Sequence, residues 1–181
     1  MNQNQSILIK AVACSYLAVA ALGASAASPA EKQEKERISA EYKMEVQKCS
    51  TLSGNPRDVC KAEAKAHEDK AEAKLESELH PSAKASKNMQ ETYADADYKV
   101  AMEKCDAFTG NDKDVCKKEA KAAKVMALET AKTNKEITDR KNDAADTKND
   151  AAYSVAKEKC DALAGNAKDK CVADAKLNYG K

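Results

Sequence analysis

Apolar and small side chains in this sequence recur at spacings of three and four residues, which is the pattern of one face of an α-helix. Three segments show this spacing most clearly: Ile38, Tyr42, Cys49 and Leu52; Tyr98, Ala101, Cys105 and Phe108; and Tyr153, Ala156, Cys160 and Leu163. No segment alternates apolar and polar residues with the period of two that marks a β-strand. The pattern therefore predicts an all-α protein.

The three segments are copies of one sequence unit, which reads Tyr-x6-Cys-x4-Gly-Asn-x4-Cys. The copies are residues 42–60, 98–116 and 153–171, and they align without gaps. The first cysteines of successive copies lie 56 and 55 residues apart, a period typical of a repeated supersecondary unit. We therefore expect three tandem antiparallel helical hairpins.

A Gly-Asn pair at the centre of each copy predicts the turn of each hairpin. We expect the glycine to end the first helix in the left-handed conformation, and the asparagine to cap the second helix. The residues concerned are Gly54, Asn55, Gly110, Asn111, Gly165 and Asn166. Asp58, Asp114 and Asp169 follow three residues after the asparagines and predict a variant capping box, while Pro56 is expected at the first helical position.

Six cysteines flank these turns, one pair in each copy. Six cysteines allow about 15 pairings, and sequence alone does not choose among them. Locality and repetition favour the pairs Cys49–Cys60, Cys105–Cys116 and Cys160–Cys171, which lie within disulfide reach across an antiparallel hairpin. Closing a loop of about 12 residues stabilises a fold by about 3 kcal/mol, which would compensate for a sparse core.

The connectors between the hairpins differ. Pro81 disfavours helix at the residue before it, so we predict a break at residues 80–82. Residues 133–148 contain neither Gly nor Pro, and they form either part of one helix of about 50 residues or a bend near Asn142. The predicted units are residues 27–81, 82–140 and a truncated third hairpin at 141–181, arranged as a loose bundle or an elongated rod.

The first 26 residues have the layout of a secretory signal peptide. Lys10 precedes an apolar run at residues 11–22, and Ala24-Ser25-Ala26 supplies the small residues of a cleavage site. We place cleavage after Ala26, with Ala27 as a close competitor. The run is too short for an ordinary membrane span, and we interpret Cys14 as part of the signal peptide rather than a lipidation site. We therefore expect an exported protein, located in the periplasm or secreted, with no stable membrane insertion after cleavage.

The composition of residues 27–181 narrows the possible functions. This part contains 30 basic and 30 acidic residues, so it lacks the basic excess that nucleic-acid binding needs. Leu, Ile, Val and Phe number 16 in these 155 residues, while Ala, Lys and Glu, which are strong helix formers, dominate. Such a chain can be strongly helical, but it is poorly suited to enclosing a deep, dry pocket.

No catalytic, cofactor or metal residues are expected. The Cys-x10-Cys pairs match neither the Cys-x-x-Cys of redox enzymes nor the short spacings of zinc sites, so we interpret them as structural disulfides. His67 and His80 have no Cys or His partner at helical spacing and are interpreted as solvated surface residues. Tyr42, Tyr98 and Tyr153 are interpreted as packing across the hairpins, with a ligand-stacking row as the alternative.

Residues 153–171 resemble a group of small exported proteobacterial proteins that carry the same Cys-x10-Cys hairpin in tandem. These are often labelled TolA-like or cell-envelope biogenesis proteins, and TolA itself is similar only in its Ala/Lys/Glu-rich composition. The resemblance implies no active site. We expect a structural, spacer or interaction module of the cell envelope with protein partners. A ligand- or metal-binding or chaperone-like protein is the alternative, and a thiol–disulfide enzyme is a third hypothesis.

Overall fold

The computed structural model describes residues 28–181, so the predicted signal peptide lies outside the described residues. Five α-helices account for nearly all of this part, and no strand occurs in it. They are α1 (Pro29–Cys49), α2 (Gly54–Leu79), α3 (Ala83–Cys105), α4 (Gly110–Cys160) and α5 (Gly165–Tyr179). The predicted all-α fold of tandem hairpins is confirmed.

Local sequence signals set the outer ends of the first hairpins. Ser28 precedes α1, and its hydroxyl accepts a hydrogen bond of 3.1 Å from the Glu31 N–H. Ser82 caps α3 in the same way, accepting from the Ala85 N–H at 3.0 Å. These oxygens satisfy N–H groups that have no partner inside the helix. The predicted break at residues 80–82 is confirmed, because α2 ends at Leu79 and α3 begins after Ser82.

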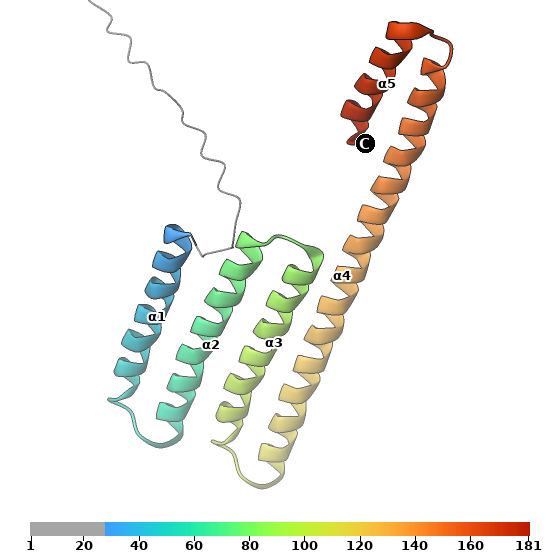
Figure 1. Cartoon of the computed structure of the whole chain (residues 1–181). Helices are drawn as coiled ribbons and strands as arrows, with labels where there is room; N and C mark the ends of the chain where they lie inside the picture. The colour runs from blue at the N-terminus through green and yellow to red at the C-terminus, as the bar shows by residue number, and fades with distance from the viewer. Residues whose placement is uncertain (1–27) are drawn as a thin grey trace, which may run out of the picture.

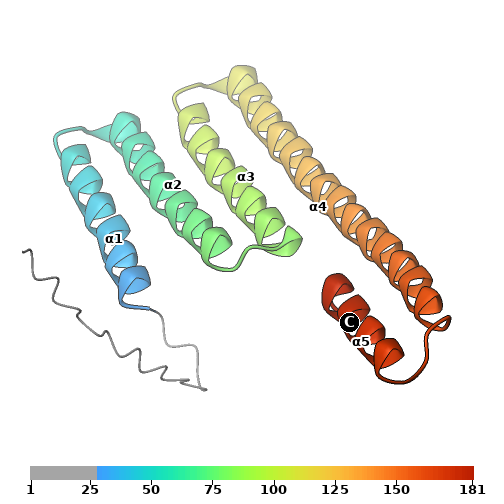
Figure 2. The same ribbon diagram turned by 90° about the horizontal axis from the view of Figure 1, so that it is seen from above.

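The helices form a single layer. Each one contacts only the helix before it and the helix after it in the chain. Figure 1 shows α1 to α4 side by side in sequence order, and the view from above in Figure 2 shows the same order. The molecule is thus neither a closed bundle nor a rod of separate hairpins. Within residues 28–181, no second layer of helices covers either face of this layer.

Helix α4 joins the second and third hairpins without interruption. It has 51 residues, so it extends over about 75 Å at about 1.5 Å per residue. Of the two alternatives for residues 133–148, the continuous helix is the one observed, and the boundary expected at residue 140 falls inside α4. In both views α3 and α5 lie on the same side of α4, one near each end (Figures 1 and 2). Between them, residues 140–148 are exposed all around the helix.

Alanine lines the contacts between the helices. Ala64 and Ala66 on α2 are both buried, although a spacing of two residues places them on nearly opposite sides of the helix. Ala94 and Ala96 repeat this arrangement on α3. Each middle helix therefore buries one alanine against each neighbour, and the small side chains let the backbones approach closely. This explains how a chain with few large apolar residues holds a layer of helices together.

Candidate functional site

The described disulfides join the two helices of every hairpin at its turn. The bonds are Cys49–Cys60, Cys105–Cys116 and Cys160–Cys171, with Cα–Cα distances of 5.6, 5.6 and 5.7 Å. The predicted local pairing is confirmed. The first cysteine of each pair is fully buried and is the last residue of its helix. These bonds thus take the place of a large apolar side chain at each hairpin tip.

The predicted role of the Gly-Asn pair at the turn needs correction. The first helices end at the cysteines, five residues before the glycines, and the glycines begin the second helices. Gly54, Gly110 and Gly165 have φ of 60°, 56° and 55°, so they do adopt the left-handed conformation, but at a helix start. The reason is that each first helix ends in a turn of backbone hydrogen bonds between residues three apart, before the chain reaches the glycine. One example is the bond from the Leu52 N–H to the Cys49 oxygen at 3.1 Å.

The N-cap positions predicted at Asn55, Asn111 and Asn166 are wrong by two residues. Ser53, Thr109 and Ala164 hold the N-cap positions, and none makes a side-chain capping hydrogen bond. Because each second helix begins at the glycine, the asparagine is its second residue, Pro56 is the third of α2, and the aspartates (Asp58, Asp114 and Asp169) are the fifth. The aspartates therefore lie beyond the register of a capping box.

Asn55 instead links two hairpins. Its side-chain N–H donates to the Glu103 backbone oxygen at 2.6 Å, near the C-terminal end of α3. That oxygen also accepts a hydrogen bond from the Asp106 backbone N–H at 3.2 Å, so the end of α3 and Asn55 share it. The contact spans 48 residues of sequence, and no spacing rule pointed to it. It fixes the start of α2 against the end of α3.

Ion pairs bridge the turns of the second and third hairpins. Asp106 accepts from Lys113 at 2.9 Å and Lys117 at 3.3 Å, and Asp161 pairs with Lys168 at 2.8 Å. The lysine hydrogen bonds hold the pKa of both aspartates below the ordinary value. Asp106 and Asp161 each directly follow a helix-ending cysteine, so the two turns are stabilised by ion pairs at equivalent positions.

The three repeated tyrosines lie at the hairpin contacts and are half-buried. The Tyr42 ring lies 5.7 Å from the Lys65 ammonium, and the Tyr98 ring lies 5.0 Å from that of Lys124. The Tyr153 ring meets Tyr179 at a centroid distance of 6.3 Å. Each tyrosine therefore packs against the second helix of its own hairpin, where a cation or another ring covers it.

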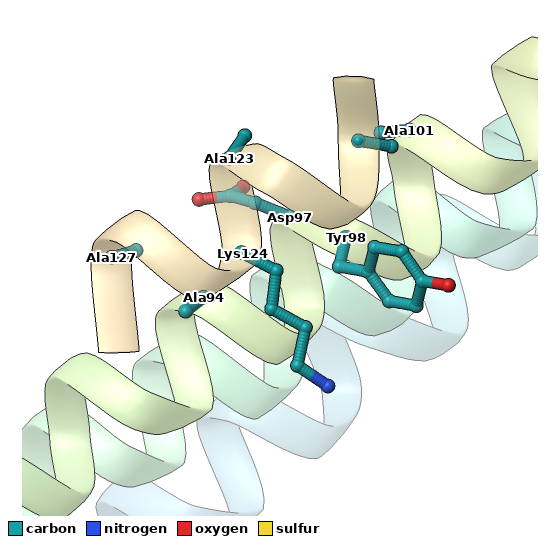
Figure 3. A pocket seen from close by; sticks show the side chains of 8 residues that line it. Ala94, Asp97, Tyr98, Ala101, Ala123, Lys124 and Ala127 are labelled. Atoms are coloured by element: carbon teal, nitrogen blue, oxygen red, sulfur yellow. The ribbon is translucent and has the colours of Figure 1, made fainter. Parts of the chain in front are cut away.

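A hollow of about 270 Å³ lies between α3 and α4, and Figure 3 shows it from close by. Alanines from both helices form most of its wall, while Tyr98, Asp97 and Lys124 supply the polar groups. The Lys124 ammonium also pairs with Asp95 at 2.5 Å, so its charge is already balanced within the protein. The hollow offers a shallow apolar surface flanked by satisfied charges.

The two histidines lie on the surface of the first hairpin. Both side chains are 67% exposed, and each faces a glutamate: His67 Nδ1 lies 2.9 Å from Glu45, and His80 lies 3.8 Å from Glu76. Within residues 28–181, no three His, Cys, Asp or Glu side chains are grouped so that they could hold a metal ion.

Large apolar side chains project from the hairpin tips. Leu52, Phe108 and Leu163 each follow a helix-ending cysteine by three residues and are 42%, 50% and 43% exposed. The sequence pattern placed them on the buried face of the first helix, but that helix has already ended. In Figure 1 the first two tips lie at one end of the layer, and the third lies at the far end of α4.

None of the helices formed by residues 28–181 combines the length and the apolar character needed to cross a lipid bilayer. Comparison of the chain with protein-family models, with curated proteins and with solved structures found no match. The function is therefore inferred from the arrangement of the helices, disulfides and exposed hairpin tips.

Proposed function

We propose that the chain is an exported helical repeat protein that acts as a structural spacer or interaction module of the cell envelope. The observation that carries the proposal is α4, a 51-residue helix with the third hairpin near one end and the rest of the layer along the other. A continuous helix keeps these two parts at a fixed separation, as a spacer requires. The apolar tips at both ends are available to contact other proteins.

The disulfides support an exported location. Disulfides persist in oxidising environments such as the periplasm and the extracellular space, and they are rare in the cytosol. Three bonds within 154 described residues fit an exported protein, and the signal-peptide layout of residues 1–26 gives the route. The resemblance to small exported proteobacterial proteins, which rests on the tandem Cys-x10-Cys hairpins, supports a place in the cell envelope.

Fractionation of the native host tests export. We expect a soluble protein outside the cytoplasm that begins at Ala27 or Ser28. A full-length chain recovered in the inner membrane would contradict the proposed export.

A length series in α4 tests the spacer role. Removing residues 138–148 shortens the helix by 11 residues, close to three turns, and keeps the third hairpin near its original side. Removing only residues 138–142 shortens it less but rotates the hairpin by about 140°. Proximity labelling in the intact envelope should show a different partner set for both deletions than for the full chain. An unchanged set in both would exclude a spacer role.

The exposed tips also favour a second function, the holding of unfolded client proteins. Leu52, Phe108 and Leu163 give every tip an apolar side chain that a client could contact. The purified protein would then suppress aggregation of a reduced model client such as α-lactalbumin. Loss of suppression in the variant with Leu52→Ser, Phe108→Ser and Leu163→Ser would support this function, and full suppression by that variant would exclude it.

A further inference from the structure

Helix α4 carries an exposed stripe of apolar and small residues along most of its length. The stripe consists of Val115, Ala122, Met126, Thr133, Ile137, Ala144, Ala151 and Val155, and all eight are exposed. Most are separated alternately by seven and four residues, an eleven-residue period. This period is close to the helical repeat, so the stripe runs almost straight along the helix. We call these eight residues the α4 stripe.

The α4 stripe lies on a different side of α4 from its buried residues. Five residues after Val115 and Met126 come Ala120 and Ala131, which are buried on the α3 side. Five residues after Val155 comes Cys160, bonded to α5. Five residues turn a helix by about 140°, so the stripe lies on the outer edge of the layer. In both views no other described helix lies along that edge of α4 (Figures 1 and 2).

The other edge of the layer has a different chemistry. On α1 the row opposite the buried Ile38 consists of Gln33, Glu36, Ala40, Lys43 and Gln47. In solenoid proteins, terminal repeats with a polar outer face end the stack of repeats. An apolar outer face, in contrast, can bind a further helix. The layer is thus closed at α1 and open at α4.

Charged residues in and beside the α4 stripe are arranged to complement a reversed copy of the same helix. Glu119 and Arg140 lie in line with the stripe, because each is 18 residues, or about five turns, from Ile137 and Ala122 respectively. Consider a second α4 running antiparallel, with Val115 opposite Val155 of the second copy and Met126 opposite Ala144. The same register brings Glu129 within one residue of Arg140, and Glu119 within one turn of Lys148. Each pair occurs twice by symmetry and has opposite charges. Within residues 28–181, none of these four side chains makes an ion pair inside the chain.

The area of the α4 stripe is sufficient for a specific contact between two copies of the helix. From Val115 to Val155 the stripe extends for about 60 Å, and a helix is about 10 Å wide. Each copy would bury about 600 Å², or about 1,200 Å² in total, which is at the lower limit of stable specific interfaces. Alanine and threonine in the stripe permit the same close helix approach that alanine permits within the layer.

We propose that the occupant of the α4 stripe is a second copy of this chain, bound antiparallel through α4 about a two-fold axis near residue 135. The dimer continues the single layer across the two α4 helices. This inference extends the proposed function by naming one partner, and it depends on that function only for the oxidising compartment. The two proposals are tested independently, because dimerisation is measured on the purified protein and envelope contacts are measured in the host.

Sedimentation velocity of the oxidised mature protein tests the proposal over a range of concentrations. We expect a reversible monomer–dimer equilibrium, shifted to monomer by at least tenfold in Kd by Met126→Glu and by Ala122→Arg. Both side chains are exposed, so far-UV circular dichroism should remain unchanged. Met44→Glu is the matched control, because Met44 is also more than half exposed but lies on α1, and it should leave the equilibrium unchanged.

A charge exchange tests the antiparallel register. Glu129→Arg and Arg140→Glu should each weaken self-association, because each brings like charges together in the homodimer. An equimolar mixture of these two variants should dimerise again, since each altered residue then meets its opposite charge in the other chain. A monomer at all concentrations up to about 1 mM, a dimer unaffected by Met126→Glu, or a mixture that stays monomeric would each overturn the proposal.

Discussion

The Cys160–Cys171 disulfide holds the helix that has the fewest other contacts. Helix α5 has 15 residues; among the described helices it contacts only α4, and Ala175 is its one buried residue. An isolated helix of this length is marginal in water. Helix α3, in contrast, contacts both α2 and α4. Removing the disulfide of the third hairpin should therefore release α5, whereas removing that of the second should leave α3 held by α2.

The magnitude follows from the loop that the disulfide closes. A loop of about 12 residues loses about 9.5 cal/mol/K of chain entropy on closure, which is about 3 kcal/mol at 25 °C. This corresponds to about a 100-fold change in the population of the open state. The remaining contacts of α5 include the Tyr153–Tyr179 ring pair and the 2.8 Å hydrogen bond from Asn149 to the Tyr179 backbone oxygen. They are too few to replace the lost constraint.

Native-state hydrogen exchange measures this directly. In the variant with Cys160→Ala and Cys171→Ala, amide protection in α5 should fall by about 100-fold while protection in α2 and α3 is retained. Cys105→Ala with Cys116→Ala should lower protection in α3 by much less. Lys170→Gln, an exposed change on α5, should alter protection by about twofold at most. Equal losses in α3 and α5, or no loss in α5, would refute the reasoning.

Three further changes test the other structural arguments. Ala96→Leu should lower the free energy of unfolding in urea by about 1–3 kcal/mol, because Ala96 is buried between α2 and α3. Gly110→Ala should lower the free energy of unfolding, measured by thermal unfolding, by about 1–2 kcal/mol. An added Cβ meets no atom within 4 Å, so this loss comes only from the positive φ. The pKa of Asp106, followed by NMR, should lie below about 3.9 and rise in the variant with Lys113→Gln and Lys117→Gln. Because this pKa is lowered on folding, its stabilising contribution is present above about pH 3.9 and disappears as pH falls through the lowered value.

Sequence reasoning succeeded where the signal was local and repeated. The helical spacing of apolar residues, the cysteine pairs on either side of each turn, and Pro81 predicted the helices, the disulfides and the break between α2 and α3. It failed by a few residues at the turns, because the end of a helix depends on competing backbone hydrogen bonds that composition does not reveal. Leu52 and its equivalents were therefore assigned to the buried face, although they lie beyond the helix end and are exposed.

Residues close together along the chain were enough to predict that this protein is helical, repetitive and stapled by local disulfides. The arrangement of the hairpins in one open layer and the link from Asn55 to α3 depend on contacts between distant residues, which no local pattern revealed. The continuity of α4 is a different case, because residues 140–148 are exposed all around the helix and their composition allowed either a helix or a bend. Alanine packs equally well on either side of a helix. The choice of face is made by neighbours far away in sequence, and that choice leaves the α4 stripe exposed.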